Sequence, residues 1–282
     1  MCINSISIIS PIKINLCLKI LNKRRDGYHN LSTIFCELKM GDELSFTKSS
    51  TFKFTTDGIV VPNDDSNIVV KAYKLISSIK NKDMPEYNIH LNKKTPVGAG
   101  LGGGSSNAAT VIKSLNTFWK LNLSTNEMIS ISIKLGSDVP FFIEGKVQHG
   151  EQKGEKLTPL NSTFLNNKKV LLICPNFSIS TAWAYQNINK YLDVHKKKIK
   201  FAPLEPQVNW RLFDNDFEKV VRSTYPETGE IIQSLRKAGA IYSGLSGSGS
   251  TVFGIYNQNF DLTDIRNSFP KNYRTFVTDF VL

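Results

Sequence analysis

A glycine-rich segment carries the most readily identified chemistry in this chain of 282 residues. Five of the seven residues from Gly98 to Gly104 are glycine, and a run with helical apolar spacing follows at once. Glycine lets backbone N–H groups close on an anion, and a helix start adds unpaired N–H groups and the positive end of the helix dipole. The segment therefore predicts a phosphate-binding loop. A flexible linker is the poorer interpretation, because a predicted strand and a predicted helix flank the loop directly.

Three common nucleotide-binding patterns do not fit this loop. Gly98, Gly100 and Gly103 have the dinucleotide spacing, but no Asp or Glu occurs from Gly104 to Asn126, where a ribose partner is needed. The Gly-Lys-Ser/Thr ending of a P-loop is absent, and so are the H-R-D and D-F-G motifs of protein kinases. The loop therefore belongs to another class of phosphate-binding protein.

Asp138 is the carboxylate in the most suggestive setting. It lies between Gly136 and Pro140, on a turn after a predicted helix, where a carboxylate can project into a cleft. Phosphoryl transfer depends on positioning, charge stabilisation and a group that orients or deprotonates the attacking hydroxyl. From the residues alone, an aspartate that only caps the turn fits equally well.

The composition is that of an ordinary globular protein, with 40% hydrophobic and 21% charged residues. No apolar run approaches the roughly 18–20 residues that a membrane span needs, and residues 3–13 show little of an export signal. The four cysteines form no C-x-x-C pair and the four histidines are scattered, which argues against a zinc site or a disulfide framework. We therefore expect a cytoplasmic protein.

The formal charge of +11 has two interpretations, nucleic-acid binding or the attraction of anionic small substrates. The lysines are dispersed except for the run at 196–198. A solvated basic loop is the favoured interpretation of that run, because the chain contains no nucleic-acid-binding signature. We expect a small-molecule substrate, with neither nucleic acid nor membrane as a partner.

The elements around these residues follow from apolar periodicity. Alternation from Ile12 to Ile20 predicts a half-buried strand, with Lys13, Asn15, Cys17 and Lys19 on the other face. Asp26-Gly27 predicts a turn and Leu31–Leu38 a returning strand. Further predicted strands are a pair at 43–47 and 51–55, then 87–91, 169–174, the two flanks of a glycine loop within 241–256, and 274–281.

Helices are predicted at 67–79, 108–119, 217–222 and 230–237. The stretch from Asn126 to Leu135 alternates like a strand, but Ser124-x-x-Glu127 is a capping box and favours a helix. Mixed elements in this order indicate an α+β fold, and the polar stretch at 151–167 is the best candidate for a domain boundary.

Four segments together resemble the GHMP kinases, the superfamily named for galactokinase, homoserine kinase, mevalonate kinase and phosphomevalonate kinase. The phosphate loop reads P-x-G-A-G-L-G-G-G-S-S-N-A-A from Pro96. The other segments are S-P-I-K-I-N-L from Ser10, R-D-G-Y-H from Arg25 and L-G-S-D-V-P-F-F from Leu135. The resemblance implies a two-domain GHMP-kinase-like fold, with an ATP-binding domain at 1–155, a C-terminal domain at 156–282 and an active site in the cleft between them.

The resemblance also implies residue roles in an ATP-dependent kinase. Asp138 is the implied general base, and Lys13 is implied to polarise it and to stabilise developing charge. Mg²⁺ is implied as the companion of ATP, and its ligands stay unknown. The implied ATP-binding residues are Pro96, Val97, Gly98, Ala99, Gly100, Leu101, Gly102, Gly103, Gly104, Ser105, Ser106, Asn67 and Asn107.

The R-D-G-Y-H turn resembles that of the superfamily member acting in non-mevalonate isoprenoid (terpenoid) biosynthesis. The implied reaction is phosphorylation of the 2-hydroxyl of 4-diphosphocytidyl-2-C-methyl-D-erythritol, a substrate whose base needs stacking partners. The implied substrate-binding residues are Asn15, Tyr28, His29, Thr181 and Tyr185. Lys153 is a candidate for the substrate phosphates, although an exposed surface lysine fits its setting at least as well.

A second glycine cluster, from Gly244 to Thr251, resembles the third motif of the superfamily, with Ser250 in place of the usual proline. The resemblance implies that it shapes the floor of the active site, whereas a simple strand-to-strand turn is the alternative. Two rival functions stay open: a sister kinase acting on homoserine, mevalonate or a sugar, and a regulator that binds ATP without turnover. We expect a monomer or a homodimer.

Overall fold

The computed structural model describes residues 5–81, 83–188 and 208–282, so the lysine run at 196–198 lies outside the described residues. The strands are β1 (Ser5–Lys23), β2 (His29–Ser49), β3 (Phe54–Gly58), β4 (Glu86–Lys93), β5 (Val147–Gln152), β6 (Lys156–Pro159), β7 (Lys168–Cys174), β8 (Tyr242–Leu245), β9 (Val252–Asn257) and β10 (Arg274–Asp279). The helices are α1 (Ile68–Ser77), α2 (Gly103–Phe118), α3 (Thr125–Ser132), α4 (Val139–Glu144), α5 (Thr181–Ile188), α6 (Phe217–Thr224), α7 (Pro226–Lys237) and α8 (Thr263–Asn267). The predicted α+β class is confirmed.

The chain forms two compact units whose segments alternate along the sequence. Unit 1 comprises Met1–Ile12, Met40–Pro96 and Gly102–Gly145, and unit 2 comprises Lys13–Lys39, Val97–Leu101 and Lys146–Leu282. Strands β1 and β2 contribute residues to both units. The expected division into domains 1–155 and 156–282 stays a prediction.

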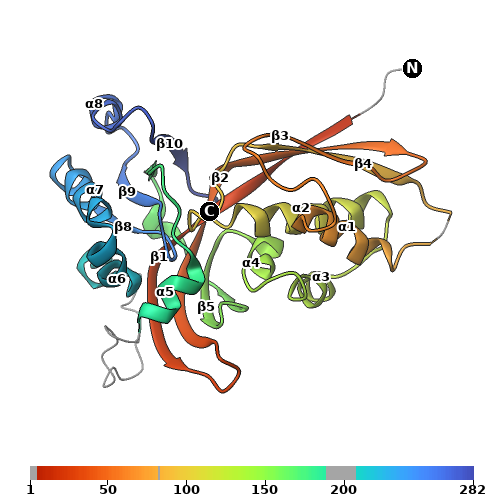
Figure 1. Cartoon of the computed structure of the whole chain (residues 1–282), viewed down its shortest axis with the longest axis horizontal. Helices are drawn as coiled ribbons and strands as arrows, with labels where there is room; N and C mark the ends of the chain where they lie inside the picture. The colour runs from red at the N-terminus through yellow and green to blue at the C-terminus, as the bar shows by residue number, and fades with distance from the viewer. Residues whose placement is uncertain (1–4, 82, 189–207) are drawn as a thin grey trace. The chain divides into compact units, whose positions relative to one another are not determined.

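Unit 1 combines a sheet with the helices α1 to α4, and α1 and α2 lie side by side (Figure 1). The second half of β2 pairs with β4 in antiparallel orientation, with Leu44 opposite Leu91. β3 pairs with β4 in parallel, with Phe54 opposite Ile89. The predicted pairing of 43–47 with 51–55 is therefore wrong. Alternation identifies a strand but does not specify its partner.

Of two short helices in unit 1, one was predicted from a local sequence signal and the other was not. α3 begins with the predicted capping box: Ser124 accepts from the backbone N–H of Glu127, whose side chain accepts from the backbone N–H of Ser124. This confirms the helix over the alternative strand. α4 was not predicted, because its six residues are almost all apolar and carry no helical periodicity.

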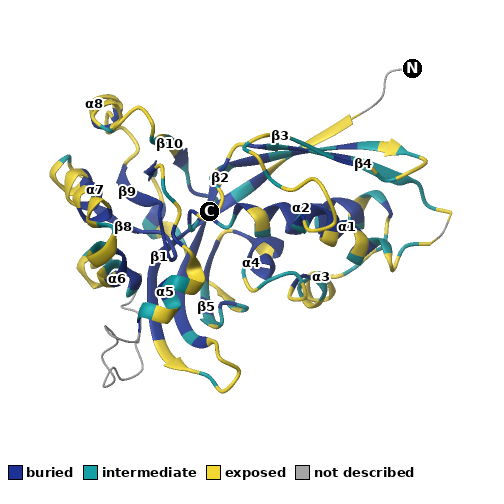
Figure 2. Cartoon of the chain, in the orientation of Figure 1, coloured by how far each residue is buried: buried dark blue, intermediate teal, exposed yellow. Residues whose placement is uncertain are grey.

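The four strands predicted in the second half of the chain are confirmed, and in unit 2 they form an antiparallel sheet in the order β10-β7-β9-β8, which was not predicted. The helices α6 and α7 contact β8, and α7 also contacts β9. Figure 2 shows β7, β8 and β9 as largely buried, whereas β10 is mostly intermediate or exposed. The core between sheet and helices includes Leu171, Ile173, Val221, Ile232 and Leu235.

The strand prediction at 12–20 is confirmed within β1, but the prediction that the strand is half-buried is wrong. The polar face is buried as well, because its residues are only 1–8% exposed: Lys13, Asn15, Cys17 and Lys19. In unit 2, β1 gains a short parallel bridge between Leu18 and Asn215, and Lys19 forms ion pairs with the acidic residues on either side of Asn215. Tertiary partners that lie far away in sequence therefore bury the polar face.

Candidate functional site

The predicted phosphate loop has a backbone that requires glycine. Gly98, Gly100 and Gly102 have φ of +65°, +78° and +69°, while the two residues between them have negative φ. Alternation of this kind turns successive N–H groups towards one side and makes an anion-binding concavity. In unit 2, a Cβ at Gly100 would also overlap the carbonyl oxygen of Ser246. The loop therefore combines a phosphate-binding geometry with a close backbone approach.

The start of α2 continues the loop in unit 1. Gly102, in the left-handed conformation, is the N-cap, and its carbonyl accepts the backbone N–H of Ser106 at 2.9 Å. The side chain of Ser106 is buried and accepts a hydrogen bond from Ser10 at 2.8 Å. Ser105 is half-buried at the same helix start. A helix start of this kind offers N–H groups to an anion.

Asn107 points into a buried network of unit 1 that the sequence did not predict. Its Nδ2 donates to Asp42 at 3.0 Å, and Asp42 also pairs with Lys93 at 2.6 Å. The Asp42 side chain is fully buried and also accepts the backbone N–H groups of Lys94 and Thr95. Burial lowers the pKa of Lys93, and the attraction of Asp42 only partly offsets this effect. The network fixes the residues that precede the loop and one residue of α2.

Asn67, the other predicted ATP-binding asparagine, is the N-cap of α1. Its Oδ1 accepts the backbone N–H of Val69 at 2.9 Å, and its Nδ2 donates to the carbonyl of Pro62 at 2.6 Å. Both ends of the amide are therefore occupied by the protein. Asn67 stabilises the start of a helix, and a contact with ATP stays a prediction.

Lys13 lies in the buried part of β1 within unit 2. Its ammonium donates to Asn15 Oδ1 at 2.6 Å and to the carbonyl oxygen of Gly100 at 3.0 Å. The Asn15 amide in turn donates to Thr33 at 2.8 Å, and the Phe35 ring lies 5.4 Å from Lys13 Nζ. Lys13 is therefore held in one position against the phosphate loop.

Asp138 is the N-cap residue of α4 in unit 1, half-buried, with no side-chain capping bond to that helix. This position agrees with the predicted turn, and simple capping does not explain the residue. Lys13 and Asp138 belong to different compact units, and their pairing stays a prediction.

Aromatic residues of the predicted cytidine site come together in unit 2. His29 and Tyr185 stack with ring centroids 5.2 Å apart and an interplanar angle of 19°. Tyr185 also packs edge-on against Phe217. Tyr28 is 62% exposed, and Lys153 Nζ lies 5.0 Å from the centre of its ring. The structure therefore brings together two residues that the resemblance implies for substrate binding, His29 and Tyr185, and places the Lys153 side chain beside a third, Tyr28.

Thr181, the first residue of α5, is joined to the second glycine loop, which we define as Gly244–Thr251. Its hydroxyl lies 3.0 Å from that of Ser248. Ser246 of the same loop donates to the carbonyl of Gly100 at 2.9 Å. Ser250, which replaces the usual proline, donates to the carbonyl of Phe177 at 2.6 Å and is buried. The loop therefore contacts the phosphate loop and is more than a strand-to-strand turn.

The residues that were not predicted from the sequence lie outside the two glycine loops and support them. Asp42 and Lys93 are ordinary charged residues 51 positions apart, and Asn215 and Glu218 precede and open a helix. For Asn215, the only local signal is an asparagine just before a predicted helix. For Asp42 there is none.

No helix among the described residues has the length and apolar character needed to cross a membrane. Across 5–81, 83–188 and 208–282, no group of three or more His, Cys, Asp or Glu side chains is arranged to hold a metal ion.

Comparison with known proteins identifies the family. The model of the GHMP kinase N-terminal domain matches residues 67–146, and that of the GHMP kinase C-terminal domain matches residues 204–275. The chain is 36% identical over 275 residues to a protein of Chloroherpeton thalassium, covering 94% of each chain. It is 39% identical over 254 residues to one of Azobacteroides pseudotrichonymphae, covering 88% of this chain and 92% of the relative.

Both relatives carry the name 4-diphosphocytidyl-2-C-methyl-D-erythritol kinase. A solved 4-(cytidine 5'-diphospho)-2C-methyl-D-erythritol kinase has a similar fold, with a TM-score of 0.79 and 25% identity over 98% of this chain and 99% of that one. Two family models and full-length relatives agree with the loop geometry, and the chain therefore belongs to the GHMP kinases, enzymes that phosphorylate small-molecule alcohols.

Proposed function

We propose that this kinase transfers the γ-phosphoryl group of ATP to the 2-hydroxyl of 4-diphosphocytidyl-2-C-methyl-D-erythritol, a step of non-mevalonate isoprenoid biosynthesis. Relatives of that name match the chain over nearly its full length. The observation that carries the substrate assignment is the stacked pair of His29 and Tyr185, since the acceptor substrate of a kinase for a simple alcohol carries no base to stack on.

The ring pair has the chemistry of a base-binding site. Each ring offers a flat face for stacking, which is worth about 1–3 kcal/mol per base. His29 is buried, and its Nε2 has no hydrogen-bond partner within the described part of the chain. A buried ring nitrogen without a partner is costly unless a ligand supplies one. Because the two rings now contact each other, a cytosine must either separate them or stack on an outer face.

The phosphates of the two substrates have separate candidate partners. The N–H groups of the loop at 98–104 and the start of α2 suit the phosphates of ATP. Lys153, which lies over the Tyr28 ring, suits the diphosphate of the cytidine substrate. The formal charge of +11 favours the approach of both anionic substrates.

The reaction requires one proton acceptor and stabilisation of charge on the transferred group. Asp138 takes the proton of the 2-hydroxyl as that oxygen bonds to the γ-phosphorus, and the bond to the β–γ bridging oxygen breaks to release ADP. Lys13 stabilises the negative charge that develops. Its position against Gly100 places it beside the loop that we assign to ATP.

Mg²⁺ would arrive with ATP and neutralise phosphate charge. This ion keeps several waters and takes few protein ligands when phosphates hold it, so a site without a three-carboxylate cluster fits it. Unit 1 offers two suitable oxygen donors, the hydroxyl of Ser105 at the start of α2 and the carboxylate of Asp138. Neither donor is a strong metal site alone, which agrees with a metal brought by the nucleotide.

We assign the reaction to the cytoplasm. Cys17, Cys36 and Cys174 are free and buried, which suits a reducing compartment.

Competition by cytidine nucleotides tests the substrate assignment. CMP and CDP should compete with the diphosphocytidyl substrate and leave the KM for ATP unchanged, because they occupy the site of His29 and Tyr185. A cytidine nucleotide that competes only with ATP, or one that fails to compete at all, contradicts the assignment. In that case, turnover of homoserine, mevalonate or a sugar identifies the sister activity.

A further inference from the structure

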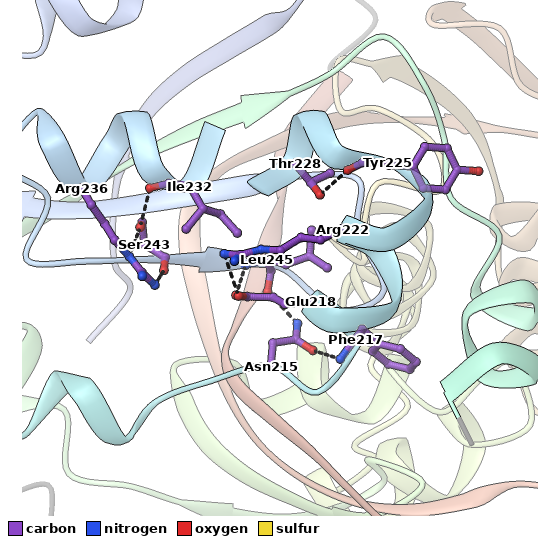
Figure 3. Close-up of polar contacts among 10 residues, drawn as sticks. All are labelled: Asn215, Phe217, Glu218, Arg222, Tyr225, Thr228, Ile232, Arg236, Ser243 and Leu245. Carbon is purple, nitrogen blue, oxygen red and sulfur yellow. Dashed lines mark hydrogen bonds and ion pairs between the residues drawn. The ribbon is translucent and has the colours of Figure 1, made fainter. Parts of the chain in front are cut away.

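Strand β8 lies at the edge of its sheet, and among the described residues it pairs with β9 alone. An edge strand presents unpaired backbone N–H and C=O groups on its outer side. Here, side chains from the region of α6 and α7 take them (Figure 3). Arg236 donates to the carbonyl of Ser243 at 3.1 Å, and Glu218 accepts the backbone N–H of Leu245 at 3.1 Å. Side chains therefore satisfy the backbone carbonyl of Ser243 and the backbone N–H of Leu245.

Asn215 extends this arrangement into the second glycine loop. Its Nδ2 donates to two carbonyl oxygens, that of Leu245 at 2.7 Å and that of Gly247 at 2.8 Å. Its Oδ1 accepts the backbone N–H of Phe217 at 3.0 Å, which fixes the orientation of the amide. Asn215 is 4% exposed. One buried side chain thus uses both amide hydrogens to hold the backbone of a functional loop.

The residues on either side of Asn215 are anchored on β1, the strand that carries Lys13. The backbone N–H of Leu18 donates to the carbonyl of Asp214 at 3.0 Å, and the backbone N–H of Asp216 donates to the carbonyl of Leu18 at 2.9 Å. Residues 214–216 therefore connect β1 to the second glycine loop: the backbone of Asp214 and Asp216 bonds to the strand, and the side chain of Asn215 bonds to the loop.

The second glycine loop and Lys13 also meet at a shared acceptor in the phosphate loop. The Ser246 hydroxyl and the Lys13 ammonium both donate to the carbonyl oxygen of Gly100, at 2.9 and 3.0 Å. The backbone N–H of Thr251 also donates to the carbonyl of Ala99 at 3.2 Å. Contacts therefore close a ring through β1, residues 214–216, the second glycine loop and the phosphate loop, and every residue that makes one of these contacts belongs to unit 2.

We propose that Asn215 is a positioning residue for ATP: it holds the second glycine loop so that Ser246 and Lys13 meet at the Gly100 carbonyl. Glu218 supports it from the neighbouring N–H of Leu245. The proposal rests on the assignment of the loop at 98–104 to ATP. It adds a residue that touches neither substrate and acts through the backbone of two loops.

Asn215→Asp is the sharpest variant. It keeps the size of the side chain and the acceptor for Phe217, but it replaces the donor with an oxygen that faces two carbonyl oxygens. We expect the affinity for the non-hydrolysable analogue AMP-PNP to fall about 10- to 100-fold, the size expected for leaving buried acceptors unsatisfied. Amide hydrogen exchange should also accelerate in peptides covering residues 244–251. Affinity for CMP should change less than about twofold.

Two further variants keep the test decisive if Asn215→Asp folds poorly. Glu218→Gln retains an acceptor for the N–H of Leu245 and should keep AMP-PNP affinity within about twofold, whereas Glu218→Ala should weaken it about three- to tenfold. Asn116→Ala is the matched control, because Asn116 likewise holds both the N–H and the C=O of a loop residue, Leu123. It should cost stability and leave AMP-PNP affinity unchanged.

The proposal is overturned if Asn215→Asp binds AMP-PNP as the wild type does, if CMP affinity falls equally, or if Asn116→Ala weakens AMP-PNP equally. It is also overturned if Glu218→Gln and Glu218→Ala behave alike. Because AMP-PNP binding and hydrogen exchange require no turnover, they decide this proposal even if the diphosphocytidyl substrate is not phosphorylated. A wrong substrate assignment can therefore be distinguished from a wrong role for Asn215.

Discussion

Replacing Asp42 with asparagine tests the buried network before α2. The carboxylate is fully buried and accepts five hydrogen bonds: from Lys93 Nζ, from the backbone N–H groups of Lys94 and Thr95, from the Thr95 hydroxyl and from Asn107. Asparagine keeps the shape but removes the charge and turns an NH₂ group towards some of these donors. The Lys93 ammonium, 5% exposed, then loses its counter-ion.

The expected cost follows from that geometry. Removing one partner of a buried ion pair leaves an uncompensated charge and costs about 3–5 kcal/mol. Lys93→Met should cost less, because the Asp42 carboxylate then keeps four donors. In the double variant no buried charge remains, so its loss of stability should be smaller than the sum of the single losses by about 1–3 kcal/mol.

Urea denaturation of the four proteins, followed by far-UV circular dichroism, measures these free energies of unfolding. AMP-PNP affinity of the folded variants shows whether the phosphate loop senses the network through Asn107. Two results refute the reasoning: additive losses in the double variant, or a loss for Asp42→Asn no larger than that for Lys93→Met. Either result means that the pair contributes no more than ordinary hydrogen bonds.

Four further predictions concern the candidate site and pH. Asp138→Asn should lower kcat by about 10²–10⁴ while AMP-PNP still binds, and full activity would contradict its role as a base. Gly100→Ala should weaken AMP-PNP by at least about tenfold, because φ is +78° and a Cβ meets the Ser246 carbonyl; unchanged affinity of a folded variant would exclude the close approach. His29→Ala should raise the dissociation constant of CMP about five- to hundredfold and spare AMP-PNP, and equal effects on both would count against stacking. Burial lowers the pKa of His149 below its usual 6.5, so the stability present above about pH 6.5 is lost as the pH falls through the folded-state pKa. Urea titrations at about pH 7.5 and 5.5 should show a smaller loss of unfolding free energy for His149→Gln than for the wild type. An equal loss in both proteins would contradict this prediction.

The elements that could be predicted are those with local signals. Alternation identified the strand at 12–20, and the capping box at Ser124 identified α3 despite an alternating pattern. Pairing was not predictable: β3 joins β4 in parallel, because partner choice depends on residues far away in sequence. Burial of the polar face of β1 depends on residues 214–216, nearly two hundred positions later.

The residues of the candidate site likewise divide into those that the sequence could identify and those that it could not. The glycine loop was identified from its own residues, and the resemblance named His29 and Tyr185, whose rings the structure places in contact. Their roles stay predictions. Asp42 and Asn215 could not be found, because an Asp in a strand and an Asn before a helix are unremarkable until the fold brings their partners to them.

The central claim is the transfer of phosphate to a cytidine-containing alcohol, and ³¹P NMR of the reaction products tests it most directly. With ATP, Mg²⁺ and 4-diphosphocytidyl-2-C-methyl-D-erythritol, the enzyme should produce ADP and one new phosphomonoester resonance in equal amounts. The diphosphate resonances of the cytidine substrate should persist, and the Asp138→Asn variant should form the product far more slowly. ADP formation without a new phosphomonoester, or a phosphomonoester formed only from homoserine, mevalonate or a sugar, would contradict the assignment.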